Sequence, residues 1–348
     1  MRGASSWRLP ATSSLPTPVS SRLTLASWGW AIRRPPPMSG PTMRDRPRGR
    51  VRRWSAAWVV LALVLGGCAP PEDEAITIGV LPWAEVRATA ELWAFLLQAE
   101  GFEAELRQID TTSPGGIVRT GEVTVVAGLY AQLADGEIDL WTGAWLPQTH
   151  APQLVEHGRD VEVLGTWYEG ARLTWAVPAS SDLTSIADLE GRGEELGGEI
   201  VGVEPGSGHV RISRDEVLPA YGLEDEYTLS TGSTGAMLAA LDRAVALDRP
   251  LVVTLWEPHP AYGRYDLRNL EDPLGALGEE ERIEVVVRDG FVADHPEIAT
   301  WLAAFELEEA ELASLQVALE DAAPGEERGA VADWVAEHRG LVDGWLGR

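Results

Sequence analysis

The sequence predicts an α/β protein built from two lobes. From residue 76 onward, short apolar runs of strand character alternate with amphipathic helical runs, a pattern typical of largely parallel sheets. The 281 residues from Cys68 to Arg348 are enough for two lobes of ordinary domain size. A Gly-rich turn at 204–208 lies inside a second series of strands and helices, as expected for a second lobe.

The first series begins with a strand at 76–80 and a helix at 85–98. Val86, Trp93 and Leu97 recur at helical spacing, and Gly101 closes the helix. The pattern then predicts a strand at 104–109, a helix at 123–134, and strands at 138–142, 161–165 and 172–177. The second series predicts strands at 200–203, 226–229 and 251–255, helices at 210–220 and 234–246, and a helical tail from residue 296.

The first 67 residues read as a leader and not as part of the fold. Six arginines within 44–53 precede a mostly apolar stretch that ends in Leu-Gly-Gly-Cys at Cys68, the order of a secretory signal. This ending resembles a bacterial lipobox, which predicts lipidation of Cys68. A transmembrane anchor is the alternative, but the stretch is shorter than the roughly 20 residues that span a bilayer. We therefore expect an extension at 1–42, a signal peptide at 43–67, a lipid-anchored tether at 68–74, and a location in the cell envelope, on the periplasmic or extracytoplasmic face.

Composition argues against several classes of chemistry. Cys68 is the only cysteine and all 28 basic residues are arginine, so disulfides, lysine Schiff bases and a Walker A lysine are absent. The six histidines show no metal-ligand spacing. We expect no enzyme activity, no cofactor and no metal.

Charge argues against nucleic acid as a partner. From Cys68 onward 17 arginines face 53 acidic residues, a net charge of −36 that repels phosphates. A source rich in salt would explain this acidity, and an ordinary acidic exported protein would explain it equally well.

Three tryptophans occupy one topological position, just past predicted strands. Trp83, Trp145 and Trp256 are each followed by proline or a short polar segment. Ligands of α/β proteins bind at the carboxyl ends of strands, and indole faces there suit a quaternary ammonium cation. The alternative is that these residues are core, because ten tryptophans follow Cys68.

An ordered set of motifs resembles one family. The motifs are Ile-Gly-x-x-x-Trp (78–83), Gly-Glu-Ile-Asp (136–139), Ala-Trp-Leu-Pro-x-Thr-His (144–150), Gly-Val-Glu-Pro-Gly-Ser-Gly (202–208), Ser-Thr-Gly-Ala-Met (233–237), Trp-x-Pro-His (256–259) and Tyr-Asp-Leu-x-x-Leu-x-Asp-Pro (265–273). Together they resemble the glycine betaine/choline substrate-binding proteins of ABC importers, over about 76–319. The resemblance implies a type II periplasmic binding protein, with ligand in a cleft between two hinged lobes. Lobe I would comprise 75–170 and 273–348, and lobe II would comprise 171–272.

The resemblance also implies a tryptophan box for the trimethylammonium group. Trp145 and Trp256 match box residues of the family, and Trp83 matches a first-strand tryptophan of choline-binding members. Leu307 and Leu173 stand where betaine members and choline members, respectively, carry an aromatic wall. Trp175, two residues after Leu173 on the same strand face, is a candidate replacement, and core packing is its alternative.

The other end of the ligand decides between betaine and choline. A carboxylate needs donors, which the helix start at Glu85 and Val86 or the turn Gly206-Ser207-Gly208-His209 could supply. Glu85 matches an acidic contact of choline members, and its alternative is a helix-dipole role. His259 could donate to a carboxylate or hold its own turn.

The sequence therefore predicts a substrate-binding component of an ABC importer for glycine betaine or a related quaternary amine, working with a permease and an ATPase. A choline or carnitine binder on the same scaffold is the alternative. A secreted hydrolase that stacks its substrate on tryptophan, and a sensor lobe for a receptor, are the alternatives from other classes.

Overall fold

Apolar runs form the buried strands that carry the rest of the fold. All five residues of β1 (Ile76–Val80) and all seven of β3 (Leu140–Leu146) are buried. Strands buried on both faces read as near-continuous apolar sequence, as these do. β2 (Ala104–Gln108) has alternating polar residues, is only partly buried, and lies at one end of the sheet.

The computed structural model describes residues 75–110 and 125–348, which belong to one compact unit of the chain. The remaining strands are β4 (Val161–Pro178), β5 (Glu199–Gly202), β6 (Thr228–Thr231), β7 (Val252–Glu257), β8 (Leu267–Asn269) and β9 (Glu281–Arg288). The longer helices are α1 (Ala84–Ala99), α2 (Val125–Ala134), α7 (Thr234–Ala246), α10 (Pro296–Ala303), α11 (Glu309–Asp321) and α12 (Glu327–Glu337). Shorter ones are α3 (Ala151–His157), α4 (Gly193–Leu196), α5 (Gly208–Ile212), α6 (Leu218–Ala220), α8 (Ala261–Arg264), α9 (Phe291–Asp294) and α13 (Arg339–Trp345), with a 3-10 turn at Ile186–Leu189 and a π-helical turn at Ser213–Val217.

The strands form one mixed sheet in the order β2-β1-β3-β9-β4-β7-β5-β6, with β8 paired to β4. β1 pairs in parallel with β2 and β3, and β5 pairs in parallel with β6 and β7. The expectation of largely parallel sheets is wrong for the middle, because β9 is antiparallel to β3 and β4, and β4 is antiparallel to β7 and β8. Alternating strands and helices predict parallel neighbours and leave no place for β9, although its β-branched run is a clear strand signal.

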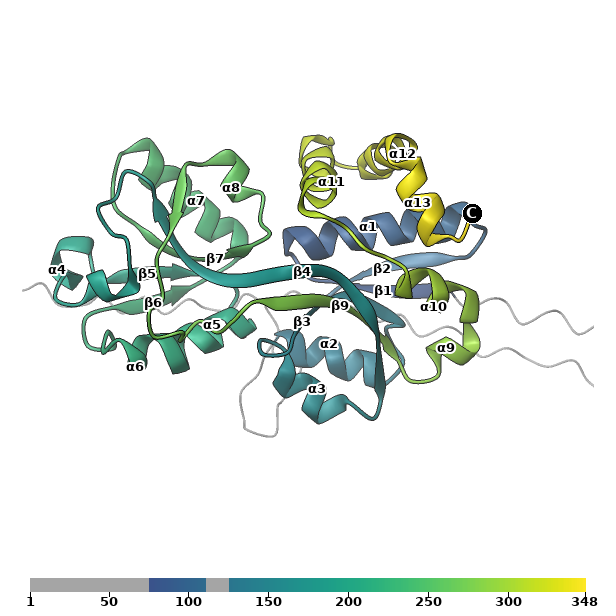
Figure 1. The fold of residues 1–348 in the computed structure, drawn as a ribbon, viewed down its shortest axis with the longest axis horizontal. Coiled ribbons are helices and arrows are strands. Elements are labelled where there is room, and N and C mark those ends of the chain that lie inside the picture. Colours follow the sequence, from purple (N-terminus) through teal and green to yellow (C-terminus); the bar gives the residue numbers. More distant parts are fainter. Residues whose placement is uncertain (1–74, 111–124) are drawn as a thin grey trace, which may run out of the picture. The chain divides into compact units, whose positions relative to one another are not determined.

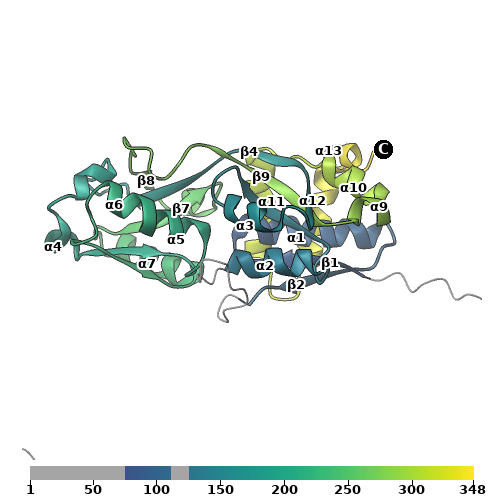
Figure 2. The same cartoon turned by 90° about the horizontal axis from the view of Figure 1, so that it is seen from below.

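β4 is a single strand of 18 residues where the sequence predicts two strands. Its first part, up to Ala171, pairs with β9, and its second part, from Arg172, pairs with β7. We call the strands β2, β1, β3 and β9 with the first part of β4 the first section, and the second part of β4 with β5 to β8 the second section. Figures 1 and 2 show β4 and the segment that leads into β9 passing together from one section to the other.

Helices cover both faces of each section (Figure 1). In the first section, α1 and α11 to α13 lie over one face, and α2 and α3 lie over the other. In the second section, α7 and α8 lie over one face, and α5 and α6 lie over the other. The predicted helix at 234–246 is confirmed by α7, whereas the predicted helix at 210–220 is α5, a π-helical turn and α6 in succession.

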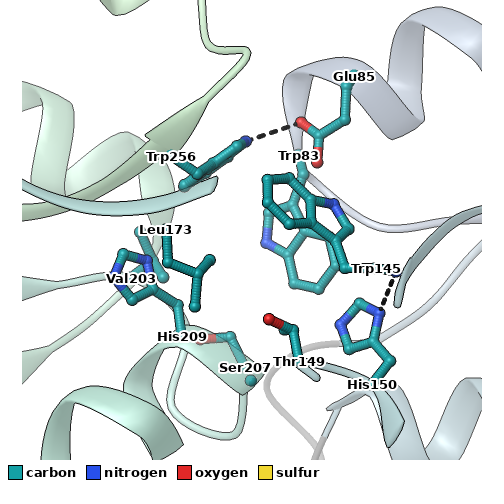
Figure 3. A pocket seen from close by; sticks show the side chains of 11 residues that line it. Trp83, Glu85, Trp145, Thr149, His150, Leu173, Val203, Ser207, His209 and Trp256 are labelled. Atoms are coloured by element: carbon teal, nitrogen blue, oxygen red, sulfur yellow. Dashed lines mark hydrogen bonds between the residues drawn. The ribbon is translucent and has the colours of Figure 1, made fainter. Parts of the chain in front are cut away.

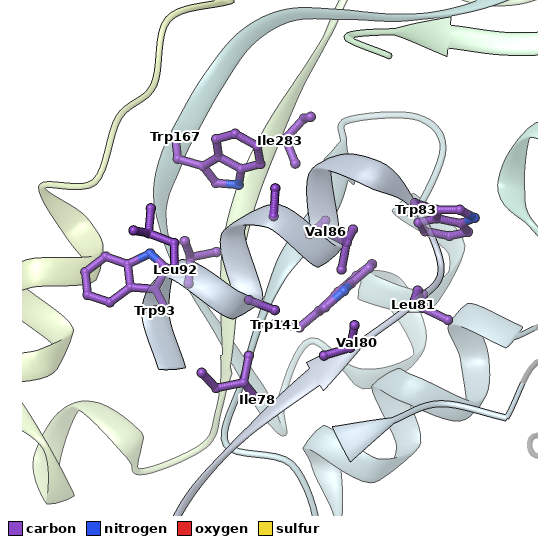
Figure 4. Close-up of a cluster of buried hydrophobic side chains, with 14 of the residues drawn as sticks. Ile78, Val80, Leu81, Trp83, Val86, Leu92, Trp93, Trp141, Trp167 and Ile283 are labelled. Carbon is purple, nitrogen blue, oxygen red and sulfur yellow. The ribbon is translucent and has the colours of Figure 1, made fainter. Parts of the chain in front are cut away.

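Tryptophans other than the three at the strand ends fill the cores. Trp93, Trp141 and Trp167 are fully buried around α1 and β3, as Figure 4 shows. The Trp167 indole Nε1 donates to the carbonyl oxygen of Thr142 at 2.6 Å, which satisfies one buried donor. Trp175 is fully buried in a separate cluster in the second section. Core packing is therefore the role of these four residues in the fold.

The start of α1 packs directly on β3, and a glycine permits this contact. A Cβ atom added at Gly143 would lie 2.5 Å from Cγ2 of Val86 and 2.9 Å from the Trp141 ring. We expect Gly143→Ala to lower the free energy of unfolding by about 1–3 kcal/mol, because the core is overpacked. Denaturant unfolding measures this loss. Gly263→Ala is the matched control, because its added Cβ has no described heavy atom within 4 Å, and a loss of equal size there would contradict the packing argument.

Candidate functional site

One cavity lies where both sections and the start of α1 meet (Figure 3). The space in it that protein atoms do not fill, its open mouth included, is about 330 Å³. Its lining comes from the ends of strands and the turns after them: Trp83, Glu85, Trp145, Thr149, His150, Leu173, Val203, Ser207, Gly208, His209 and Trp256. Five of the residues predicted from sequence as ligand contacts are therefore together in one place.

The three tryptophans enter the cavity from different elements. Trp83 is the N-cap residue of α1, while Trp145 and Trp256 are the next-to-last residues of β3 and β7. The strands thus extend further than predicted, and Trp145 and Trp256 lie within them and not beyond them. Each is followed two residues later by a cis-proline, Pro147 or Pro258. All three indoles are nearly buried.

Glu85 is a buried acid that accepts hydrogen bonds from indoles. Its Oε2 accepts from Nε1 of Trp256 at 3.1 Å, across the cavity (Figure 3). Burial raises the pKa of the Glu85 carboxyl to about 7, although hydrogen bonds from its own backbone and from the indoles of Trp256 and Trp145 oppose the shift. Near neutral pH this group therefore exists in both charge states.

Glu204 holds the third indole. Its Oε2 accepts from Nε1 of Trp83 at 3.3 Å, and from the hydroxyl of Thr234 at 2.9 Å. Its Oε1 accepts from the backbone N–H of Thr234 at 2.8 Å, at the start of α7. Glu204 is buried and follows β5, so the acceptor and its indole belong to different sections.

His150 presents a hydrogen-bond donor to the cavity. Its Nδ1 accepts from the backbone N–H of Trp145 at 2.9 Å. Burial lowers the pKa of His150 to about 3, so the ring is neutral and carries its proton on Nε2. Among the described residues, Nε2 has no hydrogen-bond partner. The ring of Trp83 stacks on this histidine with centroids 6.1 Å apart.

Thr149, Ser207 and His209 lie with His150 on the side of the tryptophans away from Glu85 (Figure 3). Glu281 fixes the turn that carries Thr149, since it accepts from the backbone N–H groups of Gln148 and Thr149 at 2.8 Å and from the Thr149 hydroxyl. Ser207 caps α5 by accepting from Val210 N–H at 3.2 Å. Burial lowers the pKa of His209 to about 3, and neither ring nitrogen has a partner in the described chain.

Four predicted contacts do not line the cavity. Val86 packs in the core behind Trp83, and Gly206 lies in the turn with a positive φ of 94°. The Trp175 indole donates to the Ser213 hydroxyl at 2.9 Å inside the second core. His259 supports Trp256 edge to face at 4.6 Å, and its Nδ1 accepts from the N–H of Ala261. The predicted lipidation site, Cys68, lies outside the described residues.

Six lining residues were not predicted individually as ligand contacts, although Gly208 and His209 belong to the turn expected to offer donors: Thr149, His150, Leu173, Val203, Gly208 and His209. The signal for Thr149 and His150 was present, because both belong to the motif that contains Trp145. Leu173 was predicted only as a position that lacks an aromatic wall. In the described ranges, no group of three or more His, Cys, Asp or Glu side chains could hold a metal ion. Within the same ranges, none of the helices combines the length and the apolar character needed to cross a bilayer.

Comparison with known proteins identifies a matching family and a similar relative. Residues 74–337 match the model of one family, the substrate-binding domain of the ABC-type glycine betaine transport system. The chain is similar to the glycine betaine/carnitine transport binding protein GbuC of Listeria monocytogenes, with 30% identity over 166 residues. That match covers 47% of this chain and only 54%, about half, of the relative's length.

Two solved structures share the fold over nearly their whole length. The glycine betaine/L-proline-binding protein ProX of Borrelia burgdorferi has a TM-score of 0.70 and 26% identity, with 78% of this chain and 96% of that chain covered. Lactococcal OpuAC, in a closed form complexed with glycine betaine, has a TM-score of 0.68 and 27% identity, with 79% and 100% covered. The predicted fold class, a type II periplasmic binding protein, is confirmed by these similarities.

The raised pKa of Glu85 makes stability depend on pH in a defined direction. Its pKa in the fold is above the ordinary value of 4.5, so the unfolded chain releases this proton more readily. The free energy of unfolding should therefore fall as pH rises from about 4.5 to about 7, by up to roughly 3 kcal/mol from this residue.

We expect Glu85→Gln to lose this contribution, so that its stability relative to the unmodified protein increases with pH over that range. Denaturant unfolding at several pH values measures the difference in the free energy of unfolding between the two proteins. The buried histidines contribute a pH dependence of the opposite sign, but they do so equally in both proteins, so it cancels in the difference. Glu156→Gln, at an exposed position, is the control. Parallel profiles for Glu85→Gln and the unmodified protein would disprove the assignment.

Proposed function

Since this chain belongs to the family of substrate-binding domains of ABC-type glycine betaine transport systems, we propose that it captures glycine betaine or a related quaternary amine in the described cavity. The proposal includes the trimethylammonium box of Trp83, Trp145 and Trp256. The protein would bind and release its ligand unchanged, without catalysis.

The observation that carries the proposal is the polarity of the cavity. Three indoles and the Glu85 carboxyl gather on one side, and neutral donors gather on the other (Figure 3). A cation over an indole face gains about 2 kcal/mol or more when it is desolvated. A trimethylammonium group has no N–H to donate in a hydrogen bond. Aromatic faces therefore suit it better than polar walls.

The carboxylate of glycine betaine would lie toward His150 and Ser207, beside the turn of Thr149, whose backbone N–H and hydroxyl already donate to Glu281. His150 supports this because its Nε2–H is buried without a partner among the described residues, a costly state that a ligand carboxylate would relieve. The Ser207 hydroxyl accepts one bond in its cap and keeps its own proton to donate. The start of α1 is less suitable, because Glu85 itself would repel a carboxylate there.

We propose that the two sections are hinged lobes, with lobe I at 75–170 and 273–348 and lobe II at 171–272. The change of β4 partner between Ala171 and Arg172 supports this boundary. A ligand that contacts residues of both sections favours the closed arrangement over the open one.

The biological setting is a proposal of the same kind. Substrate-binding proteins of ABC importers are extracytoplasmic, and this one would deliver its ligand to a permease driven by an ATPase. Lipidation of Cys68 would anchor it to the membrane through the tether at 68–74, with the leader at 1–67 removed.

Choline or carnitine is the second candidate ligand, and of these two Glu85 favours choline. The ionised carboxylate attracts the net positive charge of choline, whereas the carboxylate of glycine betaine offsets most of that attraction. A hydrolase remains the alternative from another class, and turnover abolished by loss of a carboxylate would identify it.

We expect Trp145→Leu and Trp256→Leu each to weaken glycine betaine binding at least about tenfold, because leucine keeps apolar volume but loses the π face. Calorimetric titration measures the change, with circular dichroism to show that the fold is kept. Trp334→Leu is the matched control, since Trp334 is buried in α12 and donates to Ser314 away from the cavity.

A neutral isostere provides an independent check of the same box. 3,3-Dimethylbutanoate replaces the trimethylammonium group by a tert-butyl group of the same shape, and it should bind at least about tenfold more weakly than glycine betaine. Unchanged affinity in both tryptophan variants, or equal binding of the isostere, would refute the cation box.

The choice between betaine and choline should depend on pH. Because the pKa of Glu85 is about 7, raising the pH from 6 to 8.5 ionises this group and should shift the affinity ratio toward choline. Glu85→Gln should abolish the shift, and Glu156→Gln should keep it. Calorimetry with each ligand at both pH values measures the ratio. A ratio in the unmodified protein that is constant with pH would show that Glu85 does not select between the ligands.

A further inference from the structure

Two indole–carboxylate hydrogen bonds cross between the sections in opposite directions. Trp83 of the first section donates to Glu204 of the second, and Trp256 of the second section donates to Glu85 of the first. Trp83 and Trp256, which line the cavity from different sections, are thus each held by an acid of the other section, whereas Trp145 bonds Glu85 of its own section. Both bonds are buried, where hydrogen bonds to charged acceptors contribute most.

Glu204 differs from Glu85 because it does not line the cavity. It is anchored within its own section by the backbone N–H and hydroxyl of Thr234, which leave its orientation independent of Trp83. Among the hydrogen bonds of this carboxylate in the described chain, the bond to Trp83 is therefore the one that requires the other section to be close.

A second contact shows how tightly the sections meet beside the cavity. A Cβ atom added at Gly208 would lie 2.4 Å from Cγ2 of Thr149 and 2.9 Å from its carbonyl oxygen. Glu281 fixes the Thr149 turn, and Ser207 caps the helix that begins at Gly208. The backbones of the two sections thus approach to a distance that only glycine allows.

We propose that Glu204 is a positioning residue that acts through Trp83 and couples assembly of the tryptophan box to closure of the two lobes. This inference rests on the proposed function and adds to it. Closure brings Glu204 to the Trp83 N–H, fixes the plane of the indole, and so presents its face to the cation. The open form lacks this bond, so the box is complete only when the lobes are closed.

The coupling predicts a kinetic signature. Encounter with ligand occurs in the open form, whereas release requires the bond between Glu204 and Trp83 to break. Glu204→Gln should therefore raise the dissociation rate of glycine betaine about tenfold and change the association rate little. Stopped-flow tryptophan fluorescence measures both rates. Glu226→Gln is the matched control, since Glu226 accepts backbone N–H groups of Gly191 and Gly193 within the second section only.

A double-mutant cycle separates positioning from a general loss of stability. Trp83→Phe removes the indole N–H but keeps an aromatic face. If Glu204 acts through Trp83, Glu204→Gln should have little further effect on the dissociation rate in the Trp83→Phe background. An effect of equal size in both backgrounds, or no effect in either, would overturn the proposal.

Lobe closure can also be measured without ligand. Nitroxide labels on p-acetylphenylalanine at the exposed positions 156 and 225, one in each section, report the closed fraction by pulsed electron paramagnetic resonance. We expect a smaller closed fraction in Glu204→Gln than in the unmodified protein and in Glu226→Gln. If no quaternary amine binds the unmodified protein, the proposed function fails. The distances between the labels without ligand then test the coupling by themselves. An unchanged closed fraction in Glu204→Gln overturns the coupling, and a reduced closed fraction supports it.

Discussion

The site depends on one constraint, that the buried indole N–H groups of the three cavity tryptophans need acceptors other than the ligand. A box for a quaternary ammonium group must bury several tryptophans, and each brings a donor that a trimethylammonium group cannot satisfy. Glu85 and Glu204 provide these acceptors for Trp256, Trp145 and Trp83. The same carboxylates add negative potential where the cation would lie, so they satisfy the indoles and favour the ligand together.

Burial then sets the charge of the remaining groups. The cavity raises the pKa of Glu85 toward neutrality and lowers the pKa of His150 and His209 to about 3. The histidines are consequently neutral donors, which suit a carboxylate without the added cost of a buried imidazolium. A site with a negative side and a neutral donor side suits a small zwitterion, even though the protein as a whole is strongly acidic.

The family, the fold class and the positions of the three tryptophans could be predicted from sequence, because motif order and strand periodicity are local. The family match over residues 74–337 confirms the predicted resemblance. The antiparallel pairing of β9 could not be predicted, since its partners are distant in the chain. The acceptors of the indole N–H groups could not be predicted either. Glu204 belongs to a recognisable motif, but its contact with Trp83 spans 121 positions of the chain. The sequence signals of Trp175 and His259 were plausible, yet Trp175 packs in the second core and His259 packs against Trp256 outside the cavity lining.

Tryptophan suits this double role better than the other aromatic residues. A cation approaches the face of the ring, whereas the indole N–H lies in the plane of the ring, so the two interactions do not compete for the same direction. Phenylalanine offers a face but no donor and could not be held by an acceptor of the opposite section. Tyrosine carries its donor at the far tip, where an acceptor would have to lie beyond the ring. In a site that closes on its ligand, tryptophan is therefore the most suitable residue. Its in-plane N–H can bond an acceptor on the opposite side of the site, while its face stays free for the cation.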